Sequence, residues 1–230
     1  MFSLDRLAVI EAYADWLADA GVVRGLIGPK EVPRLWDRHI LNCGVLADLV
    51  PRDATVADVG SGAGLPGLVL GIGRPDLRVT LIEPLLRRTT FLSEVVADLG
   101  LENVEVLRGR AEDVHGSRRF EIVTSRAVAP LPRLLDSSMP LVAPSGALVA
   151  MKGSSAPEEI AQSADALARW GCEAPTIHVL GEGVLESTTV AVRVAWADPS
   201  RVSWRSAPPG SKGSIPRGAS RKSRRRRPRA

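Results

Sequence analysis

The sequence predicts an α/β protein in which helices cover both faces of a mostly parallel, seven-stranded sheet, with a helical cap in front of it. Three observations support this fold class. Short apolar runs alternate with runs of helical periodicity from residue 55 to 171, an alternation that favours a parallel sheet. A glycine-rich turn at 60–67 joins the first apolar run to the next helix. Amphipathic helical stretches precede it.

The cap is predicted at residues 1–50. A first helix is expected at 4–20, where apolar residues recur at helical spacing with acids between them, and Gly21 suits its C-terminal cap. A second helix is expected at 31–49, and Pro51 ends it.

The sheet and its helices are predicted at residues 51–198. Strands are recognised by β-branched and apolar runs, and helices by their periodicity. The expected strands are 55–60, 78–83, 104–107, 120–125, 146–152, 176–180 and 188–196. The expected helices are 65–73, 86–99, 131–141 and 158–171. Because the last two strands follow each other closely, we expect them to form an antiparallel addition at one edge.

The remaining residues, 199–230, are predicted to be a disordered basic tail. They are rich in Ser, Pro, Gly and Arg, and such a segment has too little apolar surface to offset the entropy of ordering. Eleven of the 30 Lys and Arg residues lie at 201–230, and none of the 26 Asp and Glu residues does. The part before the tail is therefore acidic, although the whole chain carries a net charge of +4.

Composition also bounds the environment. The two cysteines, Cys43 and Cys172, are far apart, which fits a reducing compartment. Acidic residues in the first helix argue against a signal peptide, and no apolar run is long enough to cross a membrane. We expect a cytoplasmic protein, a monomer without a membrane partner. The three histidines show no metal-ligand spacing, so no metal is expected.

The glycine-rich turn predicts the cofactor. Glycines stand at 60, 62 and 64, a G-x-G-x-G spacing that does not fit the dinucleotide pattern G-x-G-x-x-G. Led by Asp58, this spacing is typical of methyltransferases that use S-adenosylmethionine (SAM). Gly60 and Gly62 would let the ligand approach bare backbone, and Asp58 would order the turn or meet the SAM amino group. The alternative is a plain tight turn.

An acid at the end of the second strand supports the same interpretation. Glu83 follows the run RVTLI and can accept hydrogen bonds from both ribose hydroxyls. Its alternative is a solvated strand end. The segment 110–113 follows the third strand, where methyltransferases usually flank the adenine.

Further motifs narrow the family. They are Arg38-His39-Ile40-Leu41, Gly64-Leu65-Pro66-Gly67, Glu83-Pro84-Leu85-Leu86-Arg87-Arg88, Ser125-Arg126-Ala127 and Met151-Lys152-Gly153. In this order and spacing, residues 10–196 resemble the ribosomal RNA small subunit methyltransferase G family, also known as RsmG or GidB. The resemblance implies a Rossmann-like class I SAM-dependent methyltransferase. It implies methyl transfer from SAM to N7 of a guanine in 16S rRNA, either free or in the small ribosomal subunit.

The resemblance also implies particular SAM contacts. They are Gly60, Leu65, Ala111, Glu112 and Arg126, with Glu83 as the ribose ligand. Guanine N7 carries an in-plane lone pair, so an in-line displacement needs alignment rather than an obligatory general base. We expect Arg126 and Lys152 to position the substrate by holding phosphate, carboxylate or guanine O6.

RNA binding is expected from two basic regions. Arg38 and His39 form the first, although His39 could instead pack the cap onto the sheet. Arg224, Arg225 and Arg226 in the tail form the second and suit counterion release from RNA phosphates. The alternative is a solvated tail with little effect.

Two other functions fit the sequence less well. A nicotinamide-dependent oxidoreductase is disfavoured by the glycine spacing and by the lack of a Tyr-x-x-x-Lys pair, since Tyr13 is the single tyrosine. A non-catalytic RNA-binding module is disfavoured by the intact glycine turn together with Glu83.

Overall fold

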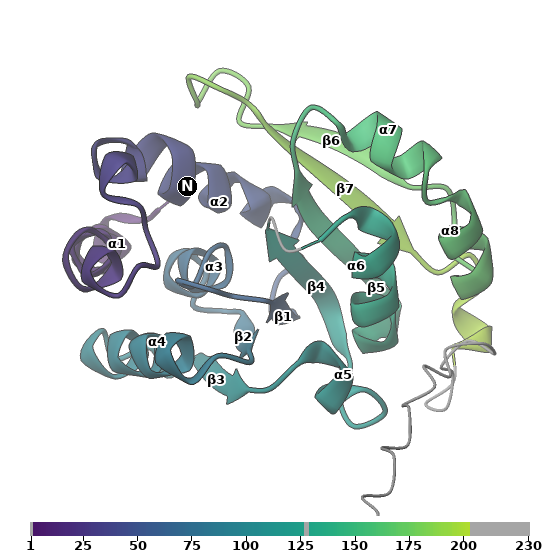
Figure 1. Ribbon diagram of the computed structural model, residues 1–230, viewed down its shortest axis with the longest axis horizontal. Helices are drawn as coiled ribbons and strands as arrows, with labels where there is room; N and C mark the ends of the chain where they lie inside the picture. Colours follow the sequence, from purple (N-terminus) through teal and green to yellow (C-terminus); the bar gives the residue numbers. More distant parts are fainter. Residues whose placement is uncertain (1, 127–128, 203–230) are drawn as a thin grey trace, which may run out of the picture.

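The computed structural model describes residues 2–126 and 129–202, and within them one sheet runs in the order β3-β2-β1-β4-β5-β7-β6 (Figure 1). Its strands are β1 (Thr55–Val59), β2 (Arg78–Glu83), β3 (Val104–Arg108), β4 (Phe120–Arg126), β5 (Val142–Lys152), β6 (Thr176–Leu180) and β7 (Thr189–Ala195). Strands β1 to β5 pair in parallel, and β7 pairs antiparallel with both β5 and β6. The predicted fold class, including the antiparallel addition at one edge, is confirmed.

The strand order reverses beside β1. From β1 the chain steps outward to β2 and β3, and then returns to β4 on the other side of β1. Val56 accordingly lies between Val79 of β2 and Ile122 of β4. In open parallel sheets the carboxyl ends of the strands at such a reversal form the ligand site, so the turn after β1 stands at the expected place.

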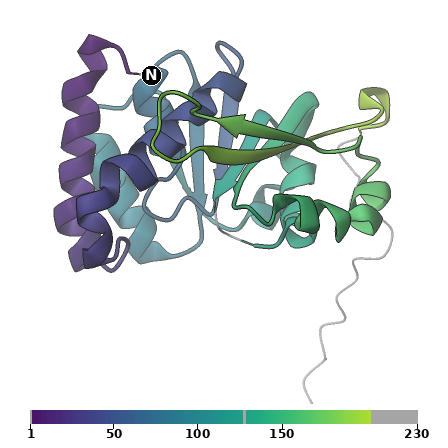
Figure 2. The same ribbon diagram turned by 90° about the horizontal axis from the view of Figure 1, so that it is seen from above.

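Helices form a layer on each face of the sheet (Figure 2). The α-helices are α1 (Leu4–Trp16), α2 (Leu41–Gly44), α3 (Gly67–Gly73), α4 (Leu86–Asp98), α5 (Ala111–Val114), α6 (Leu131–Ser138), α7 (Ala156–Ala161) and α8 (Ala164–Trp170). Side chains of α1 to α4 belong to one buried cluster, and those of α5 to α8 belong to a second. The strands divide their side chains between the two: Val56 of β1 faces the first cluster, and Ala57 faces the second.

The cap differs from two plain helices. The first helix continues into a π-helical turn, η1 (Leu17–Gly21), and the second is broken into η2 (Pro29–Arg34), η3 (Trp36–Ile40), α2 and η4 (Val45–Leu49). Pro33 lies inside η2 and lacks the amide hydrogen that an α-helix requires. Ile10 and Leu17 of the cap lie in the same buried cluster as Val56 of the sheet. The cap therefore shares a core with the sheet.

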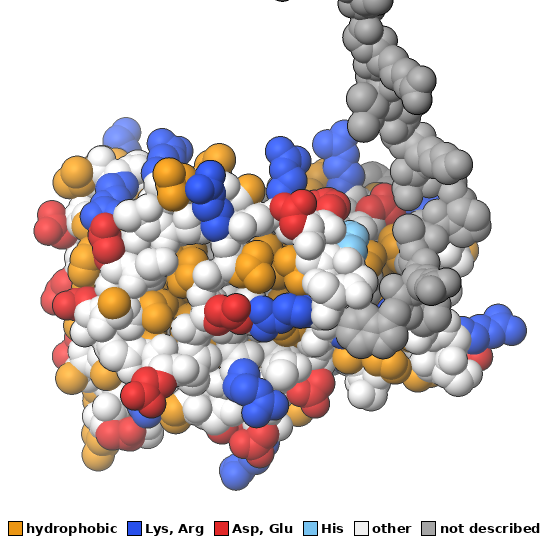
Figure 3. All heavy atoms as spheres, turned by 90° about the horizontal axis from the view of Figure 1, so that it is seen from below, with side chains coloured by type: hydrophobic (Ala, Val, Ile, Leu, Met, Phe, Trp, Pro, Cys, Tyr) orange, Lys and Arg blue, Asp and Glu red, His pale blue; other side chains and the backbone are white. Residues whose placement is uncertain are grey.

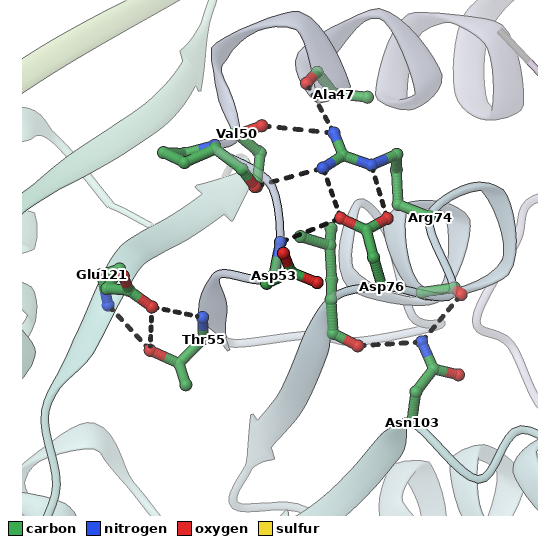
Figure 4. A network of polar contacts seen from close by, with 11 residues as sticks. Ala47, Val50, Asp53, Thr55, Arg74, Asp76, Asn103 and Glu121 are labelled. Atoms are coloured by element: carbon green, nitrogen blue, oxygen red, sulfur yellow. Dashed lines mark hydrogen bonds and ion pairs between the residues drawn. The ribbon is translucent and has the colours of Figure 1, made fainter.

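A polar network fastens the cap to the amino-terminal side of β1 (Figure 4). Arg74 donates to both carboxylate oxygens of Asp76, at 2.8 and 2.7 Å, and to the carbonyls of Ala47 and Val50. Asp76 also accepts from the amide of Asp53 at 3.0 Å. The hydrogen bonds from Arg74 hold the pKa of Asp76 below its ordinary value. This fastening lies away from the carboxyl ends of the strands and leaves them open to a ligand.

No helix of the described residues is both long and apolar enough to cross a membrane.

Candidate functional site

The glycine turn has a backbone that requires glycine at three positions. Gly60, Gly62 and Gly64 have φ angles of 73°, 58° and 101°, a region that side chains with a Cβ rarely adopt. The amide of Gly60 donates to the carbonyl of Ile82 in β2 at 2.8 Å. The turn is thus bound to the neighbouring strand and presents backbone instead of side chains.

Asp58 joins the two ends of the glycine turn through a hydrogen bond to Gly67. Its side chain is fully buried, and Oδ2 accepts from the amide of Gly67 at 3.0 Å. A Cβ at Gly67 would overlap the Leu81 side chain and come within 2.7 Å of the same oxygen. Burial raises the pKa of Asp58 to about 7, and Glu83 nearby also raises it. The other oxygen, Oδ1, is buried without a hydrogen-bond partner in the described protein, so this carboxyl has capacity for one more donor or a nearby cation.

A cavity of about 830 Å³ opens at the carboxyl ends of β1, β2 and β4. Its size is in the range of cofactor sites. Seven of the predicted SAM- or substrate-contacting residues and the predicted RNA contact His39 line it. They are Gly60, Gly62, Leu65, Glu83, Ala111, Glu112, Arg126 and His39. These eight residues, spread over 88 positions from His39 to Arg126, converge on one cavity.

Glu83 is held as a hydrogen-bond acceptor at the cavity wall. Its side chain is 1% exposed. Oε2 accepts from the amide of Gly62 at 3.0 Å and from Arg88 Nη1 at 3.3 Å, and Oε1 accepts from the amide of Leu85 at 3.0 Å. Three donors fix the carboxylate in place. Arg88 was not among the predicted site residues; it lines the cavity, and its Nε is buried without a partner in the described residues.

Arg126 ends β4 and lies against the cap. Its Nη2 donates to His39 Nδ1 at 2.6 Å, and its Nη1 lies 3.4 Å from Cys43 Sγ. Burial raises the pKa of the Cys43 thiol to about 11, so the sulfur stays protonated and uncharged near neutral pH. The guanidinium is thereby joined to the cap while it faces the cavity.

Three predicted residues do not line the cavity: Asp58, Lys152 and Arg38. The Lys152 ammonium donates to Glu159 Oε2 and to the carbonyl of Ala129, both at 2.8 Å. Arg38 points its exposed side chain toward Glu31, with Nη1 at 3.8 Å from Oε2. Arg224, Arg225 and Arg226 lie outside the described residues.

The surface charge is mixed. Figure 3 shows Lys and Arg side chains along one rim of the face seen from below, with Asp and Glu side chains between and beneath them. Two exposed arginines line the cavity, Arg110 before α5 and Arg133 on α6. Within the described part of the chain, Lys and Arg side chains therefore form small groups among acidic side chains. In residues 2–126 and 129–202, no group of His, Cys, Asp or Glu is arranged to hold a metal ion.

The sheet order, the glycine turn and the buried acid at the end of β2 define a SAM-dependent methyltransferase. The chain belongs to the family described as rRNA small subunit methyltransferase G (GidB), whose sequence pattern matches residues 6–188. It is 65% identical to the ribosomal RNA small subunit methyltransferase G of Nocardioides sp. over 93% of this chain and 85% of that protein. It is 54% identical to the one of Streptomyces avermitilis, over 83% and 80%.

Solved structures agree on the fold. The ribosomal protein L11 methylase of Lactobacillus delbrueckii subsp. bulgaricus matches with a TM-score of 0.50 at 17% identity, over 68% of this chain and 77% of that one. The precorrin-6y C5,15-methyltransferase of Geobacter metallireducens matches with a TM-score of 0.50 at 14% identity, over 74% and 90%. At such identity these likenesses concern the fold alone. The cofactor of this class of methyltransferases is SAM.

Proposed function

We propose that this protein transfers a methyl group from SAM to N7 of a guanine in 16S rRNA. One observation carries the proposal. The buried carboxylate of Glu83 is bonded to the glycine turn through the amide of Gly62, beside a cavity that Arg126 lines from the opposite strand. This combination offers an acceptor for the ribose, bare backbone for the methionine part and a cation for the substrate. A tight turn without a ligand would require none of these three groups.

The residues fit SAM in chemistry as well as position. Glu83 would accept charge-assisted hydrogen bonds from the ribose hydroxyls. Gly60, Gly62 and Leu65 would pack against the methionine part, and Ala111 and Glu112 would flank the adenine. When bound, SAM supplies an electrophilic methyl group on a sulfonium sulfur.

Asp58 would hold the glycine turn in place and stabilise the positive charge of the ligand. Its Oδ2 accepts from the Gly67 amide, and Oδ1 has no hydrogen-bond partner among the described residues, so the carboxyl places a negative charge behind the glycines when it is ionised. The cofactor carries an ammonium and a sulfonium, and a nearby anion stabilises both through the low-dielectric interior. We therefore assign Asp58 an ordering and electrostatic role, without direct contact at the cavity wall.

The substrate end needs alignment and exclusion of water. Guanine N7 attacks with its own lone pair, so the protein has to hold N7, the methyl carbon and the sulfur in line. Arg126 faces the cavity and can grip a phosphate, a carboxylate or guanine O6. Lys152 would act without touching the substrate, because its ammonium joins the end of β5 to Ala129 and to Glu159 of α7. It is a positioning residue.

RNA affinity would come from Arg38 and His39 in the cap and from Arg224, Arg225 and Arg226 in the tail. The substrate would be 16S rRNA, free or within the small ribosomal subunit. We propose that the protein acts as a monomer in the cytoplasm, which size-exclusion chromatography with light scattering and cell fractionation would test.

The proposal is tested by transfer of a tritiated methyl group from SAM to three acceptors: naked 16S rRNA, small ribosomal subunits, and subunits that already carry the modification. Transfer to unmodified acceptor and none to modified acceptor is expected. An Arg126→Ala protein that keeps both normal SAM affinity and a normal rate would contradict the role of Arg126. Oxidation of a nicotinamide cofactor without methyl transfer would favour the oxidoreductase.

A further inference from the structure

A chain of three side chains runs from the cap to the cavity. Glu31 in η2 lies 3.1 Å through Oε2 from His39 Nε2 in η3. His39 Nδ1 in turn lies 2.6 Å from Arg126 Nη2 at the end of β4. Both ring nitrogens of His39 are therefore engaged, one on each side.

The chemistry of the partners decides which ring nitrogen carries the proton. A guanidinium can only donate, so His39 Nδ1 must present its lone pair to Arg126. The ring is then neutral with its hydrogen on Nε2, and this hydrogen points at the Glu31 carboxylate. Glu31 thus favours the one tautomer that can accept from Arg126.

The surroundings keep the ring neutral. Burial and the neighbouring Arg126 lower the pKa of His39 below its ordinary value, and Arg38 acts in the same direction. Glu31 opposes them through its hydrogen bond and its charge. A protonated His39 would set an N–H group against the guanidinium, which would break the bond to Arg126.

The other contacts of Arg126 are weaker. Its Nη1 is 3.4 Å from Cys43 Sγ, and its Nη2 is 3.5 Å from the carbonyl of Arg38. The contact to the carbonyl oxygen is long, and a thiol sulfur is a weak acceptor, so the short bond to His39 is the strongest of these three contacts and sets the place of the guanidinium at the cavity wall.

We propose that Glu31 is a positioning residue for methyl transfer, which fixes the His39 tautomer and through it the orientation of Arg126. The inference rests on the proposed function for its kinetic consequence. The cap is then a part of the site. Glu31 in η2 does not line the cavity, yet it determines where Arg126, which holds the substrate, lies.

Three variants of the full chain test this. Glu31→Ala removes the acceptor and lowers kcat for methyl transfer by about tenfold or more, since a misplaced positioning group costs up to about a hundredfold. Glu31→Gln keeps an oxygen that accepts from Nε2–H and stays within about twofold of the wild type. The control is Asp37→Ala, which removes a carboxylate from the neighbouring segment η3. Asp37 makes no bond to His39 or Arg126 in the described residues, so kcat should stay unchanged. Thermal unfolding confirms that all three are folded.

The tautomer is read directly by long-range ¹⁵N–¹H NMR of the histidine rings, with His39→Gln to assign the signals. The wild type and Glu31→Gln should show His39 with hydrogen on Nε2, and Glu31→Ala should shift toward hydrogen on Nδ1. Unchanged kcat in Glu31→Ala, an equal loss in Glu31→Gln, or an unchanged tautomer in Glu31→Ala would each overturn the proposal. The tautomer is measured in the free protein, so it decides the inference even if the wild type fails to methylate rRNA.

Discussion

The hydroxyl of Tyr13, in the first helix of the cap, donates a 2.8 Å hydrogen bond to the carbonyl of Ala63 in the glycine turn. The two residues are 50 positions apart, and the tyrosine is fully buried. Burial raises the pKa of Tyr13 well above its ordinary value, so the hydroxyl keeps its proton and remains a donor. The cap therefore stabilises the conformation of the turn that lines the cavity.

Replacing this tyrosine should weaken both stability and cofactor binding. Tyr13→Phe leaves the Ala63 carbonyl buried without its partner, which costs about 1–3 kcal/mol of unfolding free energy. Urea denaturation and calorimetric titration with SAM measure the two effects. The matched control is Trp16→Phe, which removes an exposed hydrogen bond from the same helix to Asp98 and should leave SAM affinity unchanged. Equal SAM affinity in Tyr13→Phe and wild type would contradict the link to the turn.

Glu83 should govern SAM affinity through its charge and its acceptor geometry. In Glu83→Gln, one oxygen becomes an NH₂ group that faces the amide of Gly62 or of Leu85, both of which are donors. Loss of charge-assisted hydrogen bonds of about 1.5–3 kcal/mol predicts a SAM affinity about ten- to a hundredfold weaker. Equilibrium titration measures it, with Glu105→Gln on the neighbouring strand β3 as the control. An unchanged dissociation constant would remove Glu83 from the site.

Asp58 should make SAM affinity depend on pH. Its pKa of about 7 in the free protein means that it is largely protonated at pH 6. A bound cationic ligand favours the ionised form, so binding releases a proton and affinity rises from pH 6 to pH 8. The sign for stability is opposite: the raised pKa favours the folded free protein at low pH, and this contribution is lost as pH rises toward 7. Titration calorimetry in buffers of different ionisation enthalpy measures the proton, and Asp58→Asn should abolish this dependence.

The basic tail should add salt-dependent RNA affinity. Removing residues 203–230 takes away ten of the eleven Lys and Arg residues of 201–230. Because each neutralised phosphate contributes about −0.7 to the slope of log affinity against log salt on single strands, the truncated protein should bind 16S rRNA with a shallower slope. Filter binding at several salt concentrations measures it. An unchanged affinity and slope would support the solvated-tail alternative.

The fold and the position of the site could be predicted because their signals are local. The glycine spacing at 60–64 and Glu83 after an apolar run identify a strand, a turn and a strand end without knowledge of tertiary contacts. The strands β2 and β6 begin and end at the predicted residues, and the other strand boundaries moved by one position, apart from β5, which begins at Val142 instead of Gly146. The single helix predicted at 158–171 is wrong, because the chain forms two helices, α7 and α8, that are interrupted at residues 162–163.

The remaining features depend on contacts between distant segments. Helix α5 was missed because its four residues are too few to show periodicity. Nothing in the sequence indicates that Tyr13 reaches Ala63 or that Glu31 reaches His39. The place of Lys152 at a strand end predicts a substrate-positioning role, and the structure adds an ion pair with Glu159 at 2.8 Å that the sequence does not indicate. An ion pair of this kind is determined by packing, which a local pattern does not contain.

The identity of the methylated atom is tested most directly by mapping the position of the methyl group in the product. Unmodified small ribosomal subunits are incubated with the protein and SAM. Their 16S rRNA is then reduced with borohydride and treated with aniline, which cleaves the chain at N7-methylguanine, and its nucleosides are quantified by mass spectrometry. We expect one new cleavage site and about one 7-methylguanosine per 16S rRNA, and neither with Glu83→Gln under limiting SAM. Methyl incorporation at another atom or base, or none with folded protein that binds SAM, would contradict it.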